Sequence, residues 1–433
     1  EYFPAKSIEQ KNQVKLLPYN GFSLSPVLAA TVSNADQNRP AIGTVGGEST
    51  SFTPGALEGA ATWSDSSGFL WAYGGGTGQN IISSAMWRFD PLTNKWALMN
   101  GSLTGNEIPQ PNYPAHPGAK KFANSWYDVS HDRLYLFGGR GVGTNGGQGE
   151  MNDLWYYESS MNSWHLVKGS LDVNSAGDYG AVGAPDPANL PPPRMGAATW
   201  TDANANMFLF GGLNGIGRYN DIWKFEPTSG MDGGAGNWTW MGGSQENVDA
   251  VQTANDPAAR SDAKAWFSGG YAYLFGGTGS NSGYSDLWKL SCSGLPLACS
   301  WSSMQPNIEN SQTILSRKSV FSTVNRPRYY NGAAHWVNTN GDLWIYMERA
   351  FWVYRPSINQ WTGFPKLDAN GYILYGNPSQ WAPGWASSVF NSDNDLGMRT
   401  NPLVWKSGPR FFIYGGYGYN GAGQGVTWSD LWE

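Results

Sequence analysis

The sequence predicts an all-β protein built from copies of one four-stranded antiparallel unit. The clearest copy spans residues 194–240, where four short apolar runs are separated by turn-forming residues. Its second run, Met207–Phe210, is apolar at every position, which suits a strand buried on both faces. Gly211 and Gly212 follow it, and glycine allows the positive φ of a tight reversal. Such a unit must stack on a neighbour to bury its faces. Helical periodicity is nearly absent from the chain.

The same pattern recurs at intervals of roughly 40–50 residues, which is typical of a β-propeller array. Six antiparallel units, or blades, are expected at approximately residues 57–101, 118–170, 194–243, 260–304, 328–364 and 384–433. The first strand of the sixth blade is expected at residues 385–390. Length alone would suggest two or three domains, but the continuous repeat predicts a single propeller domain over residues 1–433.

The sixth blade lacks a fourth strand, because the chain stops at Glu433, just after the third. Residues 42–63 align without a gap with residues 179–200, which connect a fourth strand to the next first strand. The preceding residues 12–18 are therefore predicted to be a fourth strand that pairs with residues 429–432 and closes a ring of six blades. In the alternative, this N-terminal strand merely covers a surface.

The repeat resembles the kelch repeat, whose marks are a double glycine after the second strand and a spaced aromatic pair downstream. The double glycines are Gly74-Gly75, Gly138-Gly139, Gly211-Gly212, Gly276-Gly277 and Gly415-Gly416. The aromatic pairs are Trp87 with Trp96, Trp155 with Trp164, Trp223 with Trp238, and Trp288 with Trp301. The resemblance covers nearly the whole chain and implies a kelch-type β-propeller. It says little about function, because kelch propellers serve as enzymes, binders and scaffolds. The fifth blade has residues 347–350 in place of the glycines, so a short, different turn is expected there.

Composition favours recognition over nucleic-acid binding. Only 14% of residues are charged, against about 25% in ordinary soluble domains. The repeat explains much of the content of 57 Gly and 23 Trp, yet a weakly charged, aromatic surface also suits contacts with sugars or partner subunits. A net charge of -6 without a basic stripe argues against nucleic acid. No run of about 18 apolar residues is present, so no transmembrane span is expected.

The two cysteines, Cys292 and Cys299, flank a predicted hairpin turn between the third and fourth strands of the fourth blade. A hairpin brings such positions within disulfide reach, and a disulfide implies an oxidising, extracellular compartment. The alternative is a pair of reduced thiols in a cytosolic protein. The sequons at Asn100 and Asn237 would permit N-glycosylation in a eukaryotic secretory route, although such triplets often arise by chance.

Secreted kelch propellers include copper radical oxidases similar to galactose oxidase, which need two histidines, two tyrosines and a cysteine bonded to one tyrosine. The four histidines of this chain fall in different parts of the repeat: His116, His131, His165 and His335. Both cysteines are committed to the hairpin. Copper chemistry is therefore not expected. No His/Cys cluster has zinc spacing, and neither a metal, a cofactor nor a catalytic residue is assigned.

A set of basic residues recurs ahead of the first strands. Counting back six positions from the tryptophan that ends each first strand gives Leu57, Lys120, Arg194, Arg260 and Tyr330. Equivalent positions on first strands surround the channel of a propeller, so Lys120, Arg194, Arg260 and Tyr330 are candidate ligand-binding residues at one mouth. Arg328 would point to the same side as Tyr330. Such a ring would attract a carboxylate. Alternatively, these residues pair with loop carboxylates or rim carbonyls.

An aspartate recurs at the start of the third strand, as Asp153, Asp221, Asp286 and Asp430. Four carboxylates could suggest a calcium site, but each lies at the same place within its own blade. A local role is therefore expected, in which the carboxylate accepts backbone N–H groups from the glycine turn.

The connections between blades are long, at residues 101–118, 170–193, 242–259 and 306–327. They exceed the usual 2–6 residues and should cluster on one propeller face, where loops usually bind partners. Plain connection is the alternative.

These features predict a secreted, non-catalytic propeller for recognition or extracellular assembly, with a protein partner, a second copy of the chain or a glycan. The alternative is a carbohydrate-active enzyme similar to the sialate mutarotases, which are six-bladed kelch proteins. In it, Arg194 and Arg260 would hold the carboxylate of an acidic sugar.

Overall fold

The computed structural model describes residues 26–28, 45–77, 81–102, 105–112, 115–227, 236–245, 249–294, 298–307, 320–328, 334–347, 350–365, 399–408, 410–419 and 425–432. Over these residues the chain is all-β. It contains one short 3-10 turn, Pro356–Ile358, and no α-helix. The described part therefore holds no helix with the length and apolar character needed to cross a bilayer.

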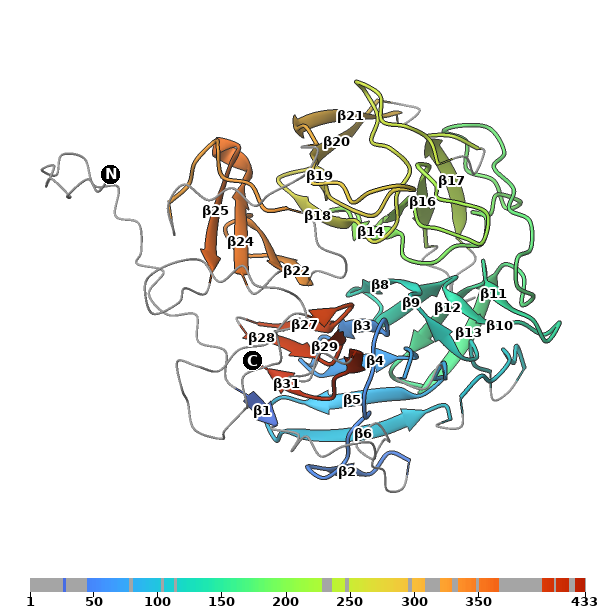
Figure 1. Cartoon of the computed structure of the whole chain (residues 1–433). Coiled ribbons are helices and arrows are strands. Elements are labelled where there is room, and N and C mark those ends of the chain that lie inside the picture. Colours follow the sequence, from blue (N-terminus) through green and yellow to red (C-terminus); the bar gives the residue numbers. More distant parts are fainter. Residues whose placement is uncertain are drawn as a thin grey trace, which may run out of the picture.

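Antiparallel meanders repeat along the chain and are numbered here as sheets 1 to 6 (Figure 1). Sheet 1 contains β3 (Ala61–Ser64), β4 (Leu70–Tyr73), β5 (Met86–Asp90) and β6 (Lys95–Asn100), with β2 (Glu48–Ser49) on its edge. Sheet 2 contains β8 (Asn124–Asp128), β9 (Arg133–Phe137), β12 (Leu154–Glu158) and β13 (Ser163–Lys168). Sheet 3 contains β14 (Ala198–Thr201), β15 (Met207–Phe210), β16 (Ile222–Glu226) and β17 (Asn237–Gly242).

The remaining sheets follow the same order of strands. Sheet 4 contains β18 (Lys264–Ser268), β19 (Tyr271–Phe275), β20 (Leu287–Ser293) and β21 (Ala298–Gln305). Sheet 5 contains β22 (Ala334–Val337), β23 (Leu343–Met347), β24 (Ala350–Arg355) and β25 (Gln360–Pro365). Sheet 6 contains β27 (Leu403–Ser407), β28 (Arg410–Tyr414), β31 (Leu431–Trp432) and β1 (Pro26–Leu28).

The first strands of the sheets lie beside one another in chain order. Strand β3 contacts β8, β8 contacts β14, β14 contacts β18, β18 contacts β22 and β22 contacts β27. Strand β27 in turn contacts β3, so the red strands of sheet 6 lie beside the blue strands of sheet 1 (Figure 1). Several four-stranded antiparallel sheets arranged in this way fit a β-propeller.

Sheet 6 differs from the sequence prediction at two points. Its first strand is β27, whereas the expected strand at residues 385–390 lies outside the described residues. The outer partner of β31 is β1, with Pro26 opposite Trp432 and Leu28 opposite Leu431. The predicted partner, residues 12–18, is therefore corrected to residues 26–28, and residues 12–18 also lie outside the described part. The alignment of two connectors placed the strand too early, because connector length is not fixed by the repeat.

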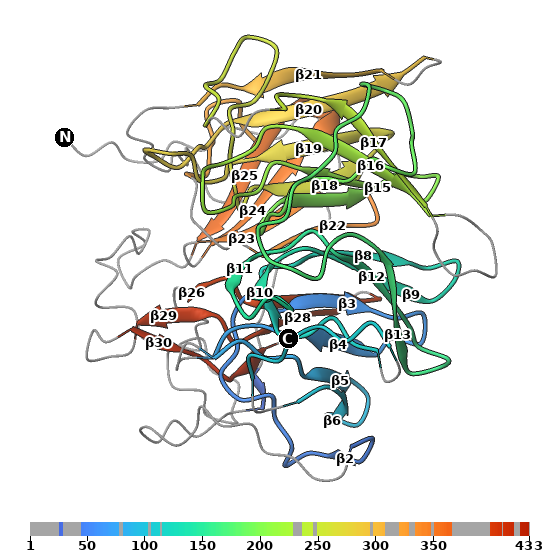
Figure 2. The same ribbon diagram turned by 90° about the vertical axis from the view of Figure 1, so that its right-hand side faces the viewer.

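Two small sheets lie outside the six meanders (Figure 2). Each pairs residues just before a first strand with a hairpin in the connection between the second and third strands. One joins β7 (Lys120–Lys121), β10 (Arg140–Val142) and β11 (Gln148–Glu150), and the other joins β26 (Arg399–Thr400), β29 (Tyr417–Tyr419) and β30 (Gly425–Thr427). In sheet 5 the corresponding connection is short, as predicted, because Met347 pairs directly with Ala350.

The double-glycine turn is sterically obligatory in sheet 3. Gly211 has φ +67° and Gly212 has φ +96°, a region that costs residues with a Cβ about 1–2 kcal/mol. A Cβ on Gly211 would also lie 2.5 Å from the carbonyl oxygen of Arg260. The glycine thus lets the loop of one sheet approach the start of the next.

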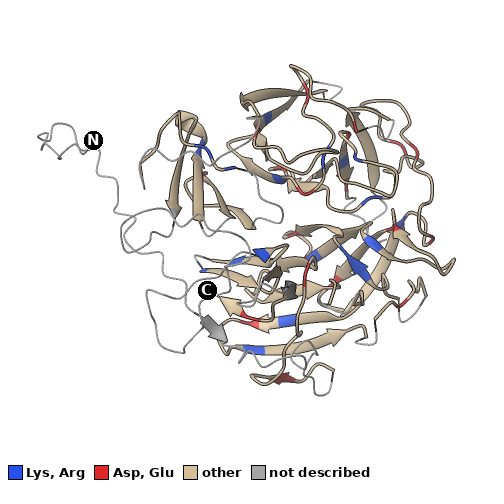
Figure 3. Ribbon diagram, viewed as in Figure 1, with Lys and Arg blue, Asp and Glu red and all other residues tan. Residues whose placement is uncertain are grey.

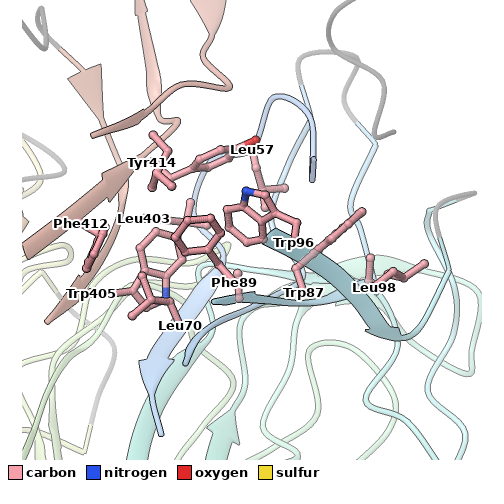
Figure 4. Packing of buried hydrophobic residues seen from close by; sticks show 13 residues of the cluster. Leu57, Leu70, Trp87, Phe89, Trp96, Leu98, Leu403, Trp405, Phe412 and Tyr414 are labelled. Carbon is pink, nitrogen blue, oxygen red and sulfur yellow. The ribbon is translucent and has the colours of Figure 1, made fainter. Parts of the chain in front are cut away.

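Tryptophans of the fourth strands wedge between neighbouring sheets. Trp96 of sheet 1 packs against Trp405 and Tyr414 of sheet 6, with ring centroids 6.4 Å and 5.4 Å away (Figure 4). Trp164 packs on Tyr73 of sheet 1 at 4.8 Å. Trp238, Trp301 and Trp361 likewise contact Phe137, Phe210 and Phe275 of the sheet before their own.

Basic and acidic residues are interspersed over the described strands and loops (Figure 3).

The predicted disulfide is present between Cys292 and Cys299. The two residues are directly opposite each other in the β20–β21 hairpin. Both cysteines pack against the apolar core that contains Trp301. The disulfide thus joins the two strands of this hairpin near its turn.

Candidate functional site

Four sheets carry a buried ion pair between a cation that precedes the first strand and an aspartate that precedes the third. The pairs are Lys120 with Asp153 at 2.8 Å, Arg194 with Asp221 at 2.6 Å, Arg260 with Asp286 at 2.6 Å and Arg399 with Asp430 at 2.7 Å. Each arginine binds both carboxylate oxygens. The tryptophan two residues after each aspartate donates its indole N–H to the same carboxylate. We call each of these four arrangements a clamp.

The clamp contains three of the predicted ligand-binding residues. Arg194 and Arg260 are both fully buried, and Arg194 also donates to the carbonyl of Gly211 at 2.9 Å. These contacts match the alternative expectation of pairing with carboxylates and rim carbonyls. A ligand carboxylate would have to displace Asp221 to reach the Arg194 guanidinium, so ligand binding there stays a prediction. Arg328 is half-buried, and Tyr330 lies outside the described residues.

The local role of the aspartates is corrected in one respect. Their carboxylates bind a cation and an indole rather than the glycine turn. The backbone carbonyl performs the predicted task, because Gly211 N–H donates to the carbonyl of Asp221 at 3.1 Å. The same bond joins Gly138 to Asp153, Gly276 to Asp286, and Gly415 to Asp430.

Arg399 is a clamp residue that was not predicted from the sequence, although it stands six positions before Trp405 and so obeys the same count. Sheet 1 replaces both partners of the clamp at once. Leu57 occupies the cation position and Ala85 the aspartate position, and they are 3% and 1% exposed. Ala85 keeps the backbone bond to Gly74 at 3.0 Å. The chain thus contains an apolar version of its own ion pair.

Two residues after the cation position, a chain of backbone hydrogen bonds links sheets 6, 1, 2, 3 and 4 within the described residues. We call this chain of bonds the belt. Phe122 N–H donates to Gly59 at 2.7 Å, Gly196 N–H to Phe122 at 3.0 Å, and Asp262 N–H to Gly196 at 2.8 Å. Gly59 N–H donates to Asn401 at 3.2 Å, which links sheet 1 to sheet 6. All five residues have positive φ, between 51° and 62°.

The belt lines a cavity of about 170 Å³. Its lining includes all five belt residues, together with side chains of the first strands such as Ser125, Thr199 and Lys264. Desolvation raises the pKa of Asp262 and lowers that of Lys264, while their mutual attraction opposes both shifts. Among the described residues, no group of three or more His, Cys, Asp or Glu side chains is placed to hold a metal ion.

His335 near the cavity gives a pH prediction. Its pKa is lowered to about 3. Desolvation is the main cause and the Lys264 ammonium acts in the same direction, while a hydrogen bond with the backbone of Ala265 opposes both effects. The ring also packs edge-on against Trp266 at 5.5 Å. The unfolded pKa is near 6.5, so below that pH the unfolded chain binds a proton that the native chain does not. Stability should therefore fall as the pH drops from about 6.5 towards 3.

Urea unfolding at pH 7 and pH 5 measures the contribution of His335 to the pH dependence of stability. Between these pH values, the free energy of unfolding of the unaltered chain should fall by up to about 2 kcal/mol more than that of the His335→Gln variant. Equal losses in both chains would show that His335 is protonated in the native state.

Both sequons lie at strand ends. Asn100 closes β6 opposite Met86, and Asn237 opens β17 opposite Glu226. Each asparagine is half-buried, and glycosylation at both positions stays a prediction.

The long connections that the structure describes leave one side of the fold. Because successive strands are antiparallel, connections from second to third strands leave the same ends of the strands as those from a fourth strand to the next sheet. We call this side the loop face. The turn at 213–218 is fixed there by two neighbours. Gly215 N–H donates to Glu150 of the small sheet that contains β11, at 3.1 Å, and Arg218 pairs with Asp249 at 3.5 Å. Ile216 at the tip is 84% exposed, and Val251 on the adjoining connector is 80% exposed.

Comparison with known proteins gives two similar chains. One is a flagellar outer-arm dynein alpha chain of Chlamydomonas reinhardtii, 29% identical over 38% of this chain and 3% of its own. The other is the Kelch domain-containing protein 10 of Xenopus tropicalis, 24% identical over 37% of this chain and 32% of its own. The chain thus spans a third or less of either relative. No family model matches. The weak similarity to a kelch-domain protein and the multi-sheet all-β structure together fit a kelch-like β-propeller.

Proposed function

We propose that this chain is a closed, six-bladed kelch-type propeller that recognises a protein partner through its loop face and has no catalytic role. Closure is supported by bonds that repeat between sheets. Trp126 and Trp266 donate their indole N–H to Phe208 and Trp344 in the next sheet, at 2.9 Å and 3.2 Å. Trp405 of sheet 6 makes the same bond to Trp71 of sheet 1, at 2.6 Å.

The observation that carries the recognition role is the exposed apolar surface around the turn at 213–218. Loops held on a rigid scaffold are the usual location of binding surfaces. Here the turn is bonded to Glu150 of β11 on one side and to Asp249 of the next connector on the other, so Ile216 is presented by a fixed backbone. Tyr417 in β29 and Ile108 in another connector are also exposed, at 38% and 39%. A protein surface with an apolar patch is the partner that these side chains suit.

An extracellular location is proposed from the disulfide, because disulfides are rare in reducing compartments. Glycan binding and self-association remain predictions from composition. The mutarotase alternative required Arg194 and Arg260 to hold a ligand carboxylate. Both guanidiniums are bonded to aspartates, so we do not propose that activity.

Affinity capture with purified chains tests the loop face. One variant carries Ile216→Asp and Val251→Asp. Its matched control carries Leu92→Asp and Met161→Asp, which alter two residues that are 88% and 66% exposed in turns between third and fourth strands, on the opposite side. Proteins held by the unaltered chain and the control, but lost from the loop-face variant, are the expected result.

Light scattering across a range of concentrations accompanies the capture. A mass that doubles for the unaltered chain, but not for the loop-face variant, would identify a second copy as the partner. Equal capture by both variants would contradict a role for this face.

A further inference from the structure

The belt imposes a conformation that two of its members adopt at a cost. Glycine reaches positive φ freely, and Gly59 and Gly196 occupy two of the five positions. Asparagine and aspartate tolerate it moderately, as at Asn401 and Asp262. A bulky aromatic residue such as Phe122, at φ 54°, is a genuine outlier. Glycine would be the residue with the least backbone strain at positions 122 and 262. We therefore expect the side chains at these positions to make interactions that offset that strain.

Both side chains lie over a belt glycine beside the cavity. A Cβ on Gly59 would meet the Phe122 ring at 2.3 Å, and one on Gly196 would meet Asp262 Oδ1 at 2.9 Å. The small residues at 59 and 196 thus make room for the large ones at 122 and 262. All four residues line the cavity.

Two opposite charges face this cavity without cancelling each other. Asp262 and Lys264 are two positions apart, so their Cα atoms are at most about 7 Å apart. Each influences the protonation of the other, yet none of the ion pairs found among the described residues joins them. The carboxylate accepts a bond from Ser261 at 2.9 Å. Within the described part of the chain, the Lys264 ammonium has no hydrogen-bond acceptor.

We propose that this cavity binds a small zwitterion that carries an ammonium and a carboxylate group on one carbon, such as a free α-amino acid. Asp262 would accept the ligand ammonium, Lys264 would donate to the ligand carboxylate, and the Phe122 ring would form the apolar wall. A zwitterion satisfies both protein charges at once, whereas a simple anion or cation would leave one half-buried charge unpaired. A cavity of about 170 Å³ accommodates about as many heavy atoms as benzene contains, which suits a small amino acid. This site is independent of the loop face.

Titration calorimetry and thermal shift test the proposal on the full chain. The probes are the twenty common L-amino acids, with acetate, methylammonium and glucose as single-charge and neutral controls. Asp262→Asn removes the carboxylate charge and keeps a residue that the belt already accepts at Asn401. Lys264→Met removes the ammonium. Asp256→Asn makes the same charge change at an exposed site far along the connector and serves as the matched control.

At least one amino acid should bind and raise the melting temperature, while the three control probes do not. Asp262→Asn and Lys264→Met should each weaken that binding by about tenfold or more, because each loses a charge-assisted hydrogen bond. Asp256→Asn should bind as the unaltered chain does. Binding of acetate or glucose alone, unchanged binding by Asp262→Asn, or no binding of any amino acid would each overturn the proposal.

Discussion

Replacing Asp286 with alanine is expected to lower the free energy of unfolding by about 3–5 kcal/mol, because it leaves the buried Arg260 guanidinium without its counter-ion. Arg260 is 0% exposed and donates to both Asp286 oxygens, at 2.6 Å and 2.9 Å. The indole N–H of Trp288 loses its acceptor in the same variant. Urea unfolding followed by tryptophan fluorescence measures the loss.

Sheet 1 supplies the control for this experiment. There Leu57 and Ala85 stand at the positions of Arg260 and Asp286. The double variant Arg260→Leu with Asp286→Ala copies that apolar pair into sheet 4. It should recover most of the stability and lie within about 2 kcal/mol of the unaltered chain, because apolar replacement of a whole buried ion pair is often close to neutral.

The single and double variants together distinguish a structural role of Arg260 from a ligand-binding role. A strong loss in Asp286→Ala that the double variant repairs means that the clamp holds the sheet together. If the single variant costs less than about 1 kcal/mol, the Arg260 charge is not confined to Asp286, and a ligand carboxylate could bind it. If the double variant is as unstable as the single one, the clamp geometry itself is required.

Both halves of the clamp were visible in the sequence, but not as partners. Arg194 and Asp221 are 27 residues apart, and Arg260 and Asp286 are 26 apart. The start of the first strand comes to lie beside the start of the third only when the glycine turn of the meander has formed. The joint replacement by Leu57 and Ala85 was the one signal that could have paired them.

The repeat pattern predicted the sheets and the tryptophan wedges because these depend on residues that recur at fixed spacing. The belt could not be predicted in this way. Its five positions hold two glycines, a phenylalanine, an aspartate and an asparagine, so no residue type marks it. Arg399 was missed for a related reason: the first strand of sheet 6 was expected at residues 385–390, whereas the strand that contains Trp405 begins at Leu403.

The second large effect concerns the outer edge of sheet 6. Removing residues 1–29 deletes β1, which pairs with β31 through Pro26 and Leu28. Leu431 and Trp432 are each 1% exposed in the intact chain, and uncovering them should lower the free energy of unfolding by about 3–6 kcal/mol. The bared edge of β31 should also promote self-association. Urea unfolding and light scattering report these two effects separately.

Removing residues 1–22 is the matched control, because it leaves β1 in place. This shorter deletion should keep the stability and the mass of the unaltered chain, since the pairing of β31 needs only residues 26–28. An equal loss in both deletions would instead return the closing role to residues 12–18, where the sequence alone had placed it. If neither deletion changes stability, the bond from Trp405 to Trp71 and the belt bond from Gly59 to Asn401 must hold sheet 6 against sheet 1 without an N-terminal strand.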